Sequence, residues 1–85
     1  MFQIVYKKKA LKALVKLPKG IRTRIRDELM KVAQSPQAYQ GDWKPLTGCP
    51  HWRLRIGDYR AICQFNKGEL VLLVLNVGPR GDIYK

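Results

Sequence analysis

The chain has 85 residues, enough for one hydrophobic core but too few for two domains, so we expect residues 1–85 to form a single domain. Its 17 Lys and Arg residues outnumber its six Asp and Glu residues, and the formal net charge is +11. No apolar run reaches the roughly 20 residues of a membrane-spanning helix, which excludes a membrane-spanning protein. The charge predicts an anionic partner, either nucleic acid or an acidic protein, with a membrane surface as the third option.

The N-terminus and the cysteines indicate a cytoplasmic protein. The apolar residues 2–6 precede Lys7, Lys8 and Lys9, the reverse of the order in a secretory leader. Cys49 and Cys63 are the only cysteines, and their spacing does not match a zinc site. We expect both thiols to be reduced and structural.

The first half of the chain predicts a strand followed by a helical hairpin. Residues 2–6 form a short, partly β-branched apolar run, which is typical of a strand. Residues 8–17 and 21–34 show helical spacing of apolar residues, with a turn at Pro18 and a stop at Ser35-Pro36. The apolar stripes expected to cover a sheet are Leu11, Leu14 and Val15 in the first helix and Ile21, Ile25, Leu29 and Val32 in the second.

The second half changes to the period of strands. Residues 51–56 and 59–65 alternate between apolar and polar side chains, as half-buried strands do. Residues 70–75 form a nearly continuous apolar run, which predicts a central strand buried on both faces. A weaker strand is expected at 43–46, where Pro45 confines it to an edge.

This order of elements predicts an α+β fold. The N-terminal strand and an antiparallel meander of three to four strands would form one twisted, antiparallel sheet, with the helical hairpin packed on one face. The other face of that sheet is then left free for function.

Basic residues gather on the face that the helices are expected to leave open. Arg53 and Arg55 alternate with the apolar residues of the strand 51–56, so both point away from the core, about 6.6–6.8 Å apart along the strand. Arg60 follows the hairpin turn and is expected beside Arg55. The alternation therefore predicts three guanidinium groups on one surface.

The C-terminal segment is expected to complete this surface. The last strand should end at Val77, after which a turn at Gly78-Pro79 would present Arg80 and then Tyr84. Lys44, on the weak edge strand, is a further candidate for binding phosphate. Like charges raise one another's electrostatic energy when they are close, so this set favours an anion site over an ordinary solvated strand.

The sequence gives little support for other kinds of active site. His51 is the only histidine, which excludes a catalytic pair of histidines, and the acidic residues are too scattered to suggest a magnesium site. The sequence has no glycine-rich phosphate loop. If the protein is an enzyme, we expect it to use neither a metal ion nor a small-molecule cofactor.

The motifs, in their order and spacing, resemble the RelE/ParE toxin superfamily of prokaryotic toxin–antitoxin systems over essentially the whole chain. They are Ala10-Leu11-Lys12-Ala13-Leu14, Leu17-Pro18, Ser35-Pro36, Leu46-Thr47-Gly48, the run from Trp52 to Arg60, and the run from Val77 to Tyr84.

This resemblance implies a RelE-like endoribonuclease that inhibits translation by cutting mRNA in the ribosomal A site without a metal ion. In such enzymes the ribose 2′-hydroxyl attacks the adjacent phosphate and leaves a 2′,3′-cyclic phosphate. By the match, Arg53 and Arg55 occupy the positions of the family's basic pair, and Arg60 that of its phosphate-binding arginine. Arg80 matches the late arginine and Tyr84 the C-terminal tyrosine. Catalysis is therefore expected from Arg55, Arg60, Arg80 and Tyr84, and phosphate binding from Lys44, Arg53, Arg55 and Arg60.

The resemblance also implies partners and leaves alternatives open. A cognate antitoxin with an acidic or amphipathic segment would wrap and neutralise the toxin. The lysines of the helices would suit docking on ribosomal RNA and could equally meet an acidic antitoxin. Many relatives have lysines at the basic pair, and arginine is a poor proton acceptor. Tyr84 is therefore expected to deprotonate or orient the 2′-hydroxyl, or to stack on the base. Pro79 also departs from the histidine or lysine of many relatives. The alternatives are a ParE-like inhibitor of DNA gyrase without ribonuclease activity, and a non-catalytic RNA-binding module.

Overall fold

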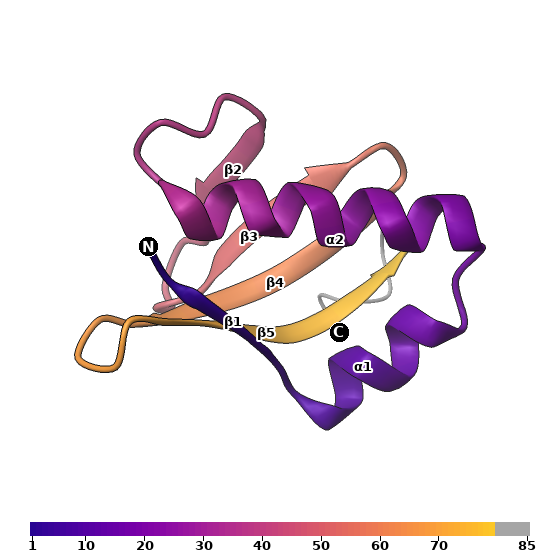
Figure 1. Ribbon diagram of the computed structural model, residues 1–85, viewed down its shortest axis with the longest axis horizontal. Helices are drawn as coiled ribbons and strands as arrows, with labels where there is room; N and C mark the ends of the chain where they lie inside the picture. The colour runs from indigo at the N-terminus through magenta and orange to yellow at the C-terminus, as the bar shows by residue number, and fades with distance from the viewer. Residues whose placement is uncertain (80–85) are drawn as a thin grey trace.

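The computed structural model describes residues 1–79, which form a five-stranded sheet and two helices (Figure 1). The elements in chain order are β1 (Gln3–Tyr6), α1 (Lys8–Val15), α2 (Lys19–Gln34), β2 (Asp42–Pro45), β3 (Trp52–Ile56), β4 (Tyr59–Asn66) and β5 (Val71–Pro79). None of the helices in this part of the chain is long and apolar enough to cross a membrane.

The sheet has the strand order β1-β5-β4-β3-β2. Strands β2 to β5 form the predicted antiparallel meander, whereas β1 pairs with β5 in parallel. The expectation of a wholly antiparallel sheet is therefore wrong at this edge. After the helices the chain enters the sheet at the far edge, and three reversals of direction bring β5 beside β1 with the same orientation.

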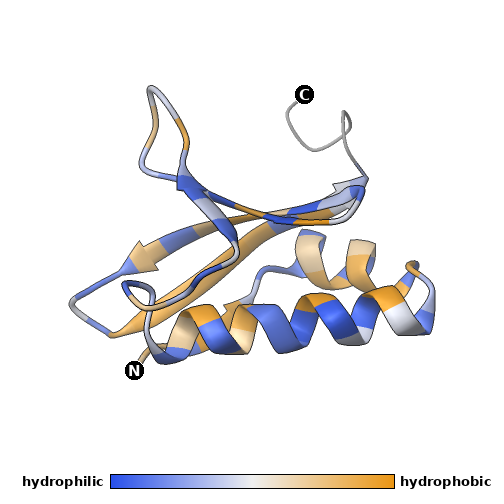
Figure 2. Ribbon diagram, turned by 90° about the horizontal axis from the view of Figure 1, so that it is seen from above, coloured by the Kyte–Doolittle hydropathy of each residue, from blue (hydrophilic) through white to orange (hydrophobic). Residues whose placement is uncertain are grey.

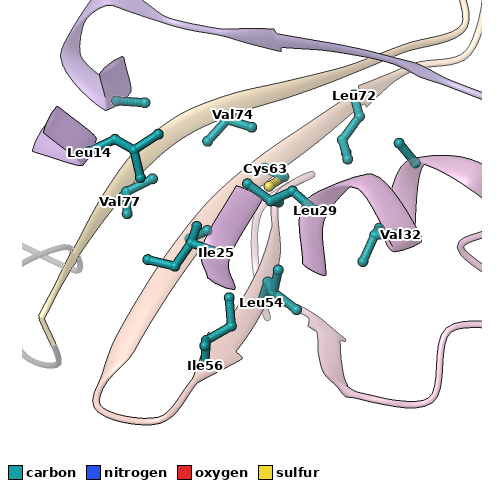
Figure 3. Packing of buried hydrophobic residues seen from close by; sticks show 13 residues of the cluster. Leu14, Ile25, Leu29, Val32, Leu54, Ile56, Cys63, Leu72, Val74 and Val77 are labelled. Atoms are coloured by element: carbon teal, nitrogen blue, oxygen red, sulfur yellow. The ribbon is translucent and has the colours of Figure 1, made fainter. Parts of the chain in front are cut away.

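Both helices pack on the same face of the sheet, as predicted (Figure 2). Ile25, Leu29 and Val32 of α2 are fully buried and form the core together with residues of the strands (Figure 3). Their partners on the sheet include Leu54, Ile56, Cys63, Leu72, Val74 and Val77. We call the opposite side of the sheet the open face.

The short helix α1 differs from its predicted packing. Ala10 and Leu14 are its buried residues, while Leu11 and Val15 are 49% and 57% exposed. The helix ends at Val15, so only two turns are available, and residues four apart share the side that meets the sheet. Leu11 and Val15 lie about 100° further around the axis. The prediction that these two residues cover the sheet is wrong.

Strand β5 is longer and less buried than predicted. It continues through Gly78 and Pro79, which pair with Arg60 and Tyr59, so the turn expected at Gly78-Pro79 is wrong. Leu72 and Val74 are buried, but Leu73 is only half-buried because no helix covers the open face. A register shift opposite Ile62 and Cys63 then returns Val77 to the core side, which simple alternation from Val74 would not do.

Candidate functional site

The open face carries two transverse rows of side chains. Residues that pair directly across a sheet lie on the same face, so the strand register assigns both rows. The first row consists of Asp42, Arg55, Arg60 and Gly78, in order from β2 to β5. The second consists of Lys44, Arg53, Ile62 and Asn76. The structure thus brings together four of the predicted site residues: Lys44, Arg53, Arg55 and Arg60.

A tight turn sets the most important of these pairings. Gly57 and Asp58 connect β3 to β4, and Gly57 has a φ of 57°, a left-handed conformation that glycine adopts readily. The turn places Arg55 directly opposite Arg60. The backbones of Arg55 and Arg60 are therefore paired on neighbouring strands, and both side chains belong to the open face.

Arg60 is far less exposed than its predicted position on an open surface implied. It is only 7% exposed and is the one charged residue that is buried among those the structure describes. It lies in the middle of the sheet, between Arg55 on β3 and Gly78 on β5. Water screens a charge less in such a position than at the surface. A phosphate that approached Arg60 would therefore interact with a charge that water screens less than that of an exposed arginine.

Arg53 has a partner that the sequence did not reveal. Its Nη2 atom donates to Oδ1 of Asp42 at 2.7 Å, and the two side chains are 22% and 34% exposed. Asp42 lies just before the edge strand predicted at 43–46, and nothing in the sequence gave the register of that strand against β3. The register of β2 against β3 is what brings Asp42 to the open face.

Two further predicted site residues, Arg80 and Tyr84, are outside the described residues. His51 is half-buried just before β3, and its carbonyl oxygen accepts a hydrogen bond from the Leu46 amide at 2.9 Å, which closes the β2–β3 connection. Among residues 1–79, no three His, Cys, Asp or Glu side chains come together as a metal site would require.

Three aromatic residues of the strands, Trp43, Trp52 and Phe65, lie on the other side of the sheet. Trp43 stacks on Trp52 with ring centroids 5.2 Å apart, and Phe65 meets both rings edge-on at 5.9 Å. Trp43 pairs with Leu54, so this cluster extends the core side rather than the open face. These rings therefore stabilise the end of the sheet, and they are separated from the arginines by the sheet itself.

Two titratable groups of the fold are unsuited to proton transfer or nucleophilic attack. Burial raises the pKa of the Cys63 thiol to about 12, so this side chain stays protonated in the core. Burial and the hydrogen bond to Glu28, at 2.9 Å, raise the pKa of Tyr39 to about 12 as well. Among the described residues, the groups that could take part in a reaction at the open face are its lysine and arginine side chains and the carboxylate of Asp42.

The sequence and the fold match known toxins. Residues 4–84 match the family described as the ParE toxin of type II toxin–antitoxin systems, parDE. The chain is also 28% identical over 75 residues to the mRNA interferase toxin RelE of Escherichia coli K12, covering 88% of this chain and 79% of that protein.

Two solved structures show the same fold. The RelE chain of the archaeal RelE–RelB complex from Pyrococcus horikoshii is 29% identical, with a TM-score of 0.80 over 95% of this chain and 97% of that one. The isolated Escherichia coli RelE toxin is 26% identical, with a TM-score of 0.80 over 99% and 92% of the two chains. The predicted fold class and the predicted RelE/ParE resemblance are both confirmed.

Proposed function

The chain belongs to the ParE toxin family of type II toxin–antitoxin systems, and we propose that it is a toxin that cleaves ribosome-bound mRNA without a metal ion. The observation that carries this proposal is the pair formed by Arg55 and the buried Arg60 on the open face. Such a pair suits a phosphodiester, because guanidinium groups bind phosphate oxygens through two parallel hydrogen bonds. The resemblance to an mRNA interferase supports the same substrate.

In the proposed reaction, the ribose 2′-hydroxyl attacks the adjacent phosphorus, the P–O5′ bond breaks, and a 2′,3′-cyclic phosphate and a 5′-hydroxyl are formed. Negative charge grows on the phosphoryl oxygens during the attack. Arg55 and Arg60 would stabilise that charge, with Arg53 and Lys44 holding flanking phosphates, because fixed cations are most effective where charge develops. Tyr84, as a tyrosinate, would take the proton of the 2′-hydroxyl, and Arg80 would donate a proton to the leaving O5′ atom, so that the step consumes no net proton.

The first test is cleavage of mRNA by the purified protein in EDTA, with free and ribosome-bound mRNA compared. We expect cleavage of the ribosome-bound mRNA, with 2′,3′-cyclic phosphate ends. Arg80→Ala and Tyr84→Phe should each lower the rate by about 10²-fold or more, which is the usual effect of removing one transition-state donor. Wild-type rates in both variants would remove these residues from the proposed site.

A second candidate function comes from the family match itself, since the matching family is that of ParE toxins. A ParE-like toxin would inhibit DNA gyrase and leave mRNA intact. The same preparations distinguish the two functions. Absence of mRNA cleavage on ribosomes, together with inhibition of gyrase supercoiling, would replace the ribonuclease proposal with this one.

The antitoxin is proposed to bind at the exposed side of α1. Leu11 and Val15 form an apolar strip there, and a groove between the two helices runs beside it. Its lining includes Lys19, Arg22 and Arg26. An amphipathic antitoxin helix with apolar and acidic side chains would complement both the strip and the cations, whereas RNA would gain little from the apolar floor.

Leu11→Asp is expected to weaken binding of the antitoxin about tenfold or more while mRNA cleavage stays unchanged. The substitution removes an apolar contact and repels an acidic partner, at a position remote from the open face. Titration calorimetry with the cognate antitoxin measures the effect. The matched control is Met30→Asp, which places the same charge on an equally exposed apolar residue of α2. Equal weakening by both variants would contradict the assignment to α1.

A further inference from the structure

The site contains one carboxylate that a simple phosphate-binding surface would not include. Asp42 stands in register with Arg55 and forms an ion pair with Arg53. A carboxylate repels a bound phosphate, so its presence here lowers the affinity of the surface for RNA. Its position on the open face therefore requires another explanation than binding strength.

The geometry of the ion pair between Asp42 and Arg53 suggests a different role for the carboxylate. The two residues lie on the neighbouring strands β2 and β3, and their side chains meet diagonally, because Asp42 is opposite Arg55 and not Arg53. The carboxylate holds one edge of the Arg53 guanidinium through Nη2, at 2.7 Å. The Nε atom of Arg53 has no hydrogen-bond partner among residues 1–79 and is buried. The ion pair thus restrains one edge of the guanidinium, and a phosphate would have to approach Arg53 through a nitrogen other than the buried Nε.

An arginine side chain without such a partner samples many rotamers, and ordering it on binding costs free energy. A guanidinium that is already oriented gives its full electrostatic effect when charge develops on the phosphate. We propose that Asp42 is a positioning residue, which orients Arg53 for the transition state and lowers the affinity for RNA in the ground state. This inference rests on the proposed ribonuclease function.

The proposal predicts that kcat and KM respond differently when the charge of Asp42 is removed. In Asp42→Asn the amide has the same shape and its oxygen still accepts a hydrogen bond, but the charge-assisted interaction with Arg53 is lost. We expect kcat to fall about tenfold or more, because small errors of position slow a reaction strongly. KM should stay constant or fall, because a negative charge has left the phosphate site. Asp42→Glu should recover part of kcat.

The experiment measures kcat and KM for cleavage of ribosome-bound mRNA from pH 5 to pH 9. Binding is measured separately, with an mRNA that carries a 2′-deoxy nucleotide at the cleavage position. The matched control is Asp58→Asn, which removes the same charge from the exposed turn between β3 and β4. That control should keep the wild-type kcat. Thermal unfolding of each variant shows that the fold is retained.

Three results would overturn the inference. A kcat of Asp42→Asn equal to that of the wild type would show that Arg53 needs no orientation. A rise in KM with kcat unchanged would make Asp42 a binding determinant. Loss of the acidic limb of the pH profile in this variant alone would make it the proton acceptor. If the wild-type protein itself does not cleave, the proposed function fails and this inference fails with it. If the wild-type protein cleaves mRNA, the proposed function stands and the Asp42 variants test this inference by itself.

Discussion

Arg60→Ala is expected to lower the rate of mRNA cleavage by about 10²–10³-fold, the largest effect of any single substitution on the open face. The corresponding loss of transition-state stabilisation is ~2.7–4 kcal/mol, the range measured when one fixed donor is removed from an enzyme site. The expected loss of rate is this large because Arg60 is buried between Arg55 and Gly78, where water screens its charge least. Single-turnover cleavage of ribosome-bound mRNA provides the measurement.

Two companion variants make this result interpretable. Arg60→Lys keeps the charge but cannot form two parallel hydrogen bonds to phosphate, so its rate should lie between those of the alanine variant and the wild type. Lys67→Ala removes an exposed cation from the connection between β4 and β5, at the other end of β4 from Arg60, and should cleave at the wild-type rate. A folded Arg60→Ala protein with wild-type activity would show that the row of arginines is not the site.

Leu54→Ala is expected to have the largest effect on stability, lowering the free energy of unfolding by about 3–5 kcal/mol. Leu54 is fully buried in β3, between Trp43 on β2 and Ala61 on β4, and it belongs to the core beneath the helices (Figure 3). Its neighbours are held in strands and cannot collapse fully into the cavity. Since small domains have a total stability of about 5–15 kcal/mol, this loss removes a large part of it.

Urea unfolding at 25 °C measures this loss of stability. Leu11→Ala is the matched control, because Leu11 is half-exposed on α1 and alanine favours the helix, so the change should stay within about 0.5 kcal/mol. Leu54→Ala should also impair cleavage near its unfolding midpoint, because Leu54 lies between Arg53 and Arg55 and anchors both. A loss below about 1 kcal/mol would mean that the core repacks around the cavity.

Local patterns in the sequence were sufficient for the elements and for the direction of most side chains. The apolar stripe of α2 at Ile25, Leu29 and Val32 is buried as its spacing predicted, and the alternation in β3 separates Arg53 and Arg55 from the core. The pairing of Arg55 with Arg60 also followed from the sequence, because a two-residue turn leaves only one register. These features depend on neighbours in the chain, which the sequence displays directly.

Four features depended on contacts between distant segments, and only the tertiary structure decided them. The parallel pairing of β1 with β5 requires knowledge of which edge the meander enters. The exposure of Leu11 and Val15 depends on how α1 lies on the sheet. The burial of Arg60 depends on its central place among five strands, and the ion pair of Asp42 depends on the register across a long connection.

The chain by itself therefore determined which chemical groups are present and, for most of the elements, which face they occupy, since the periods of helices and strands are local properties. It did not determine how strongly water screens each charge, or which acidic side chain forms an ion pair with which basic one. Those quantities depend on distances between residues far apart in sequence, and they change when a strand shifts by one residue. At the open face, the burial of Arg60 and the ion pair of Asp42 come from the assembled sheet alone.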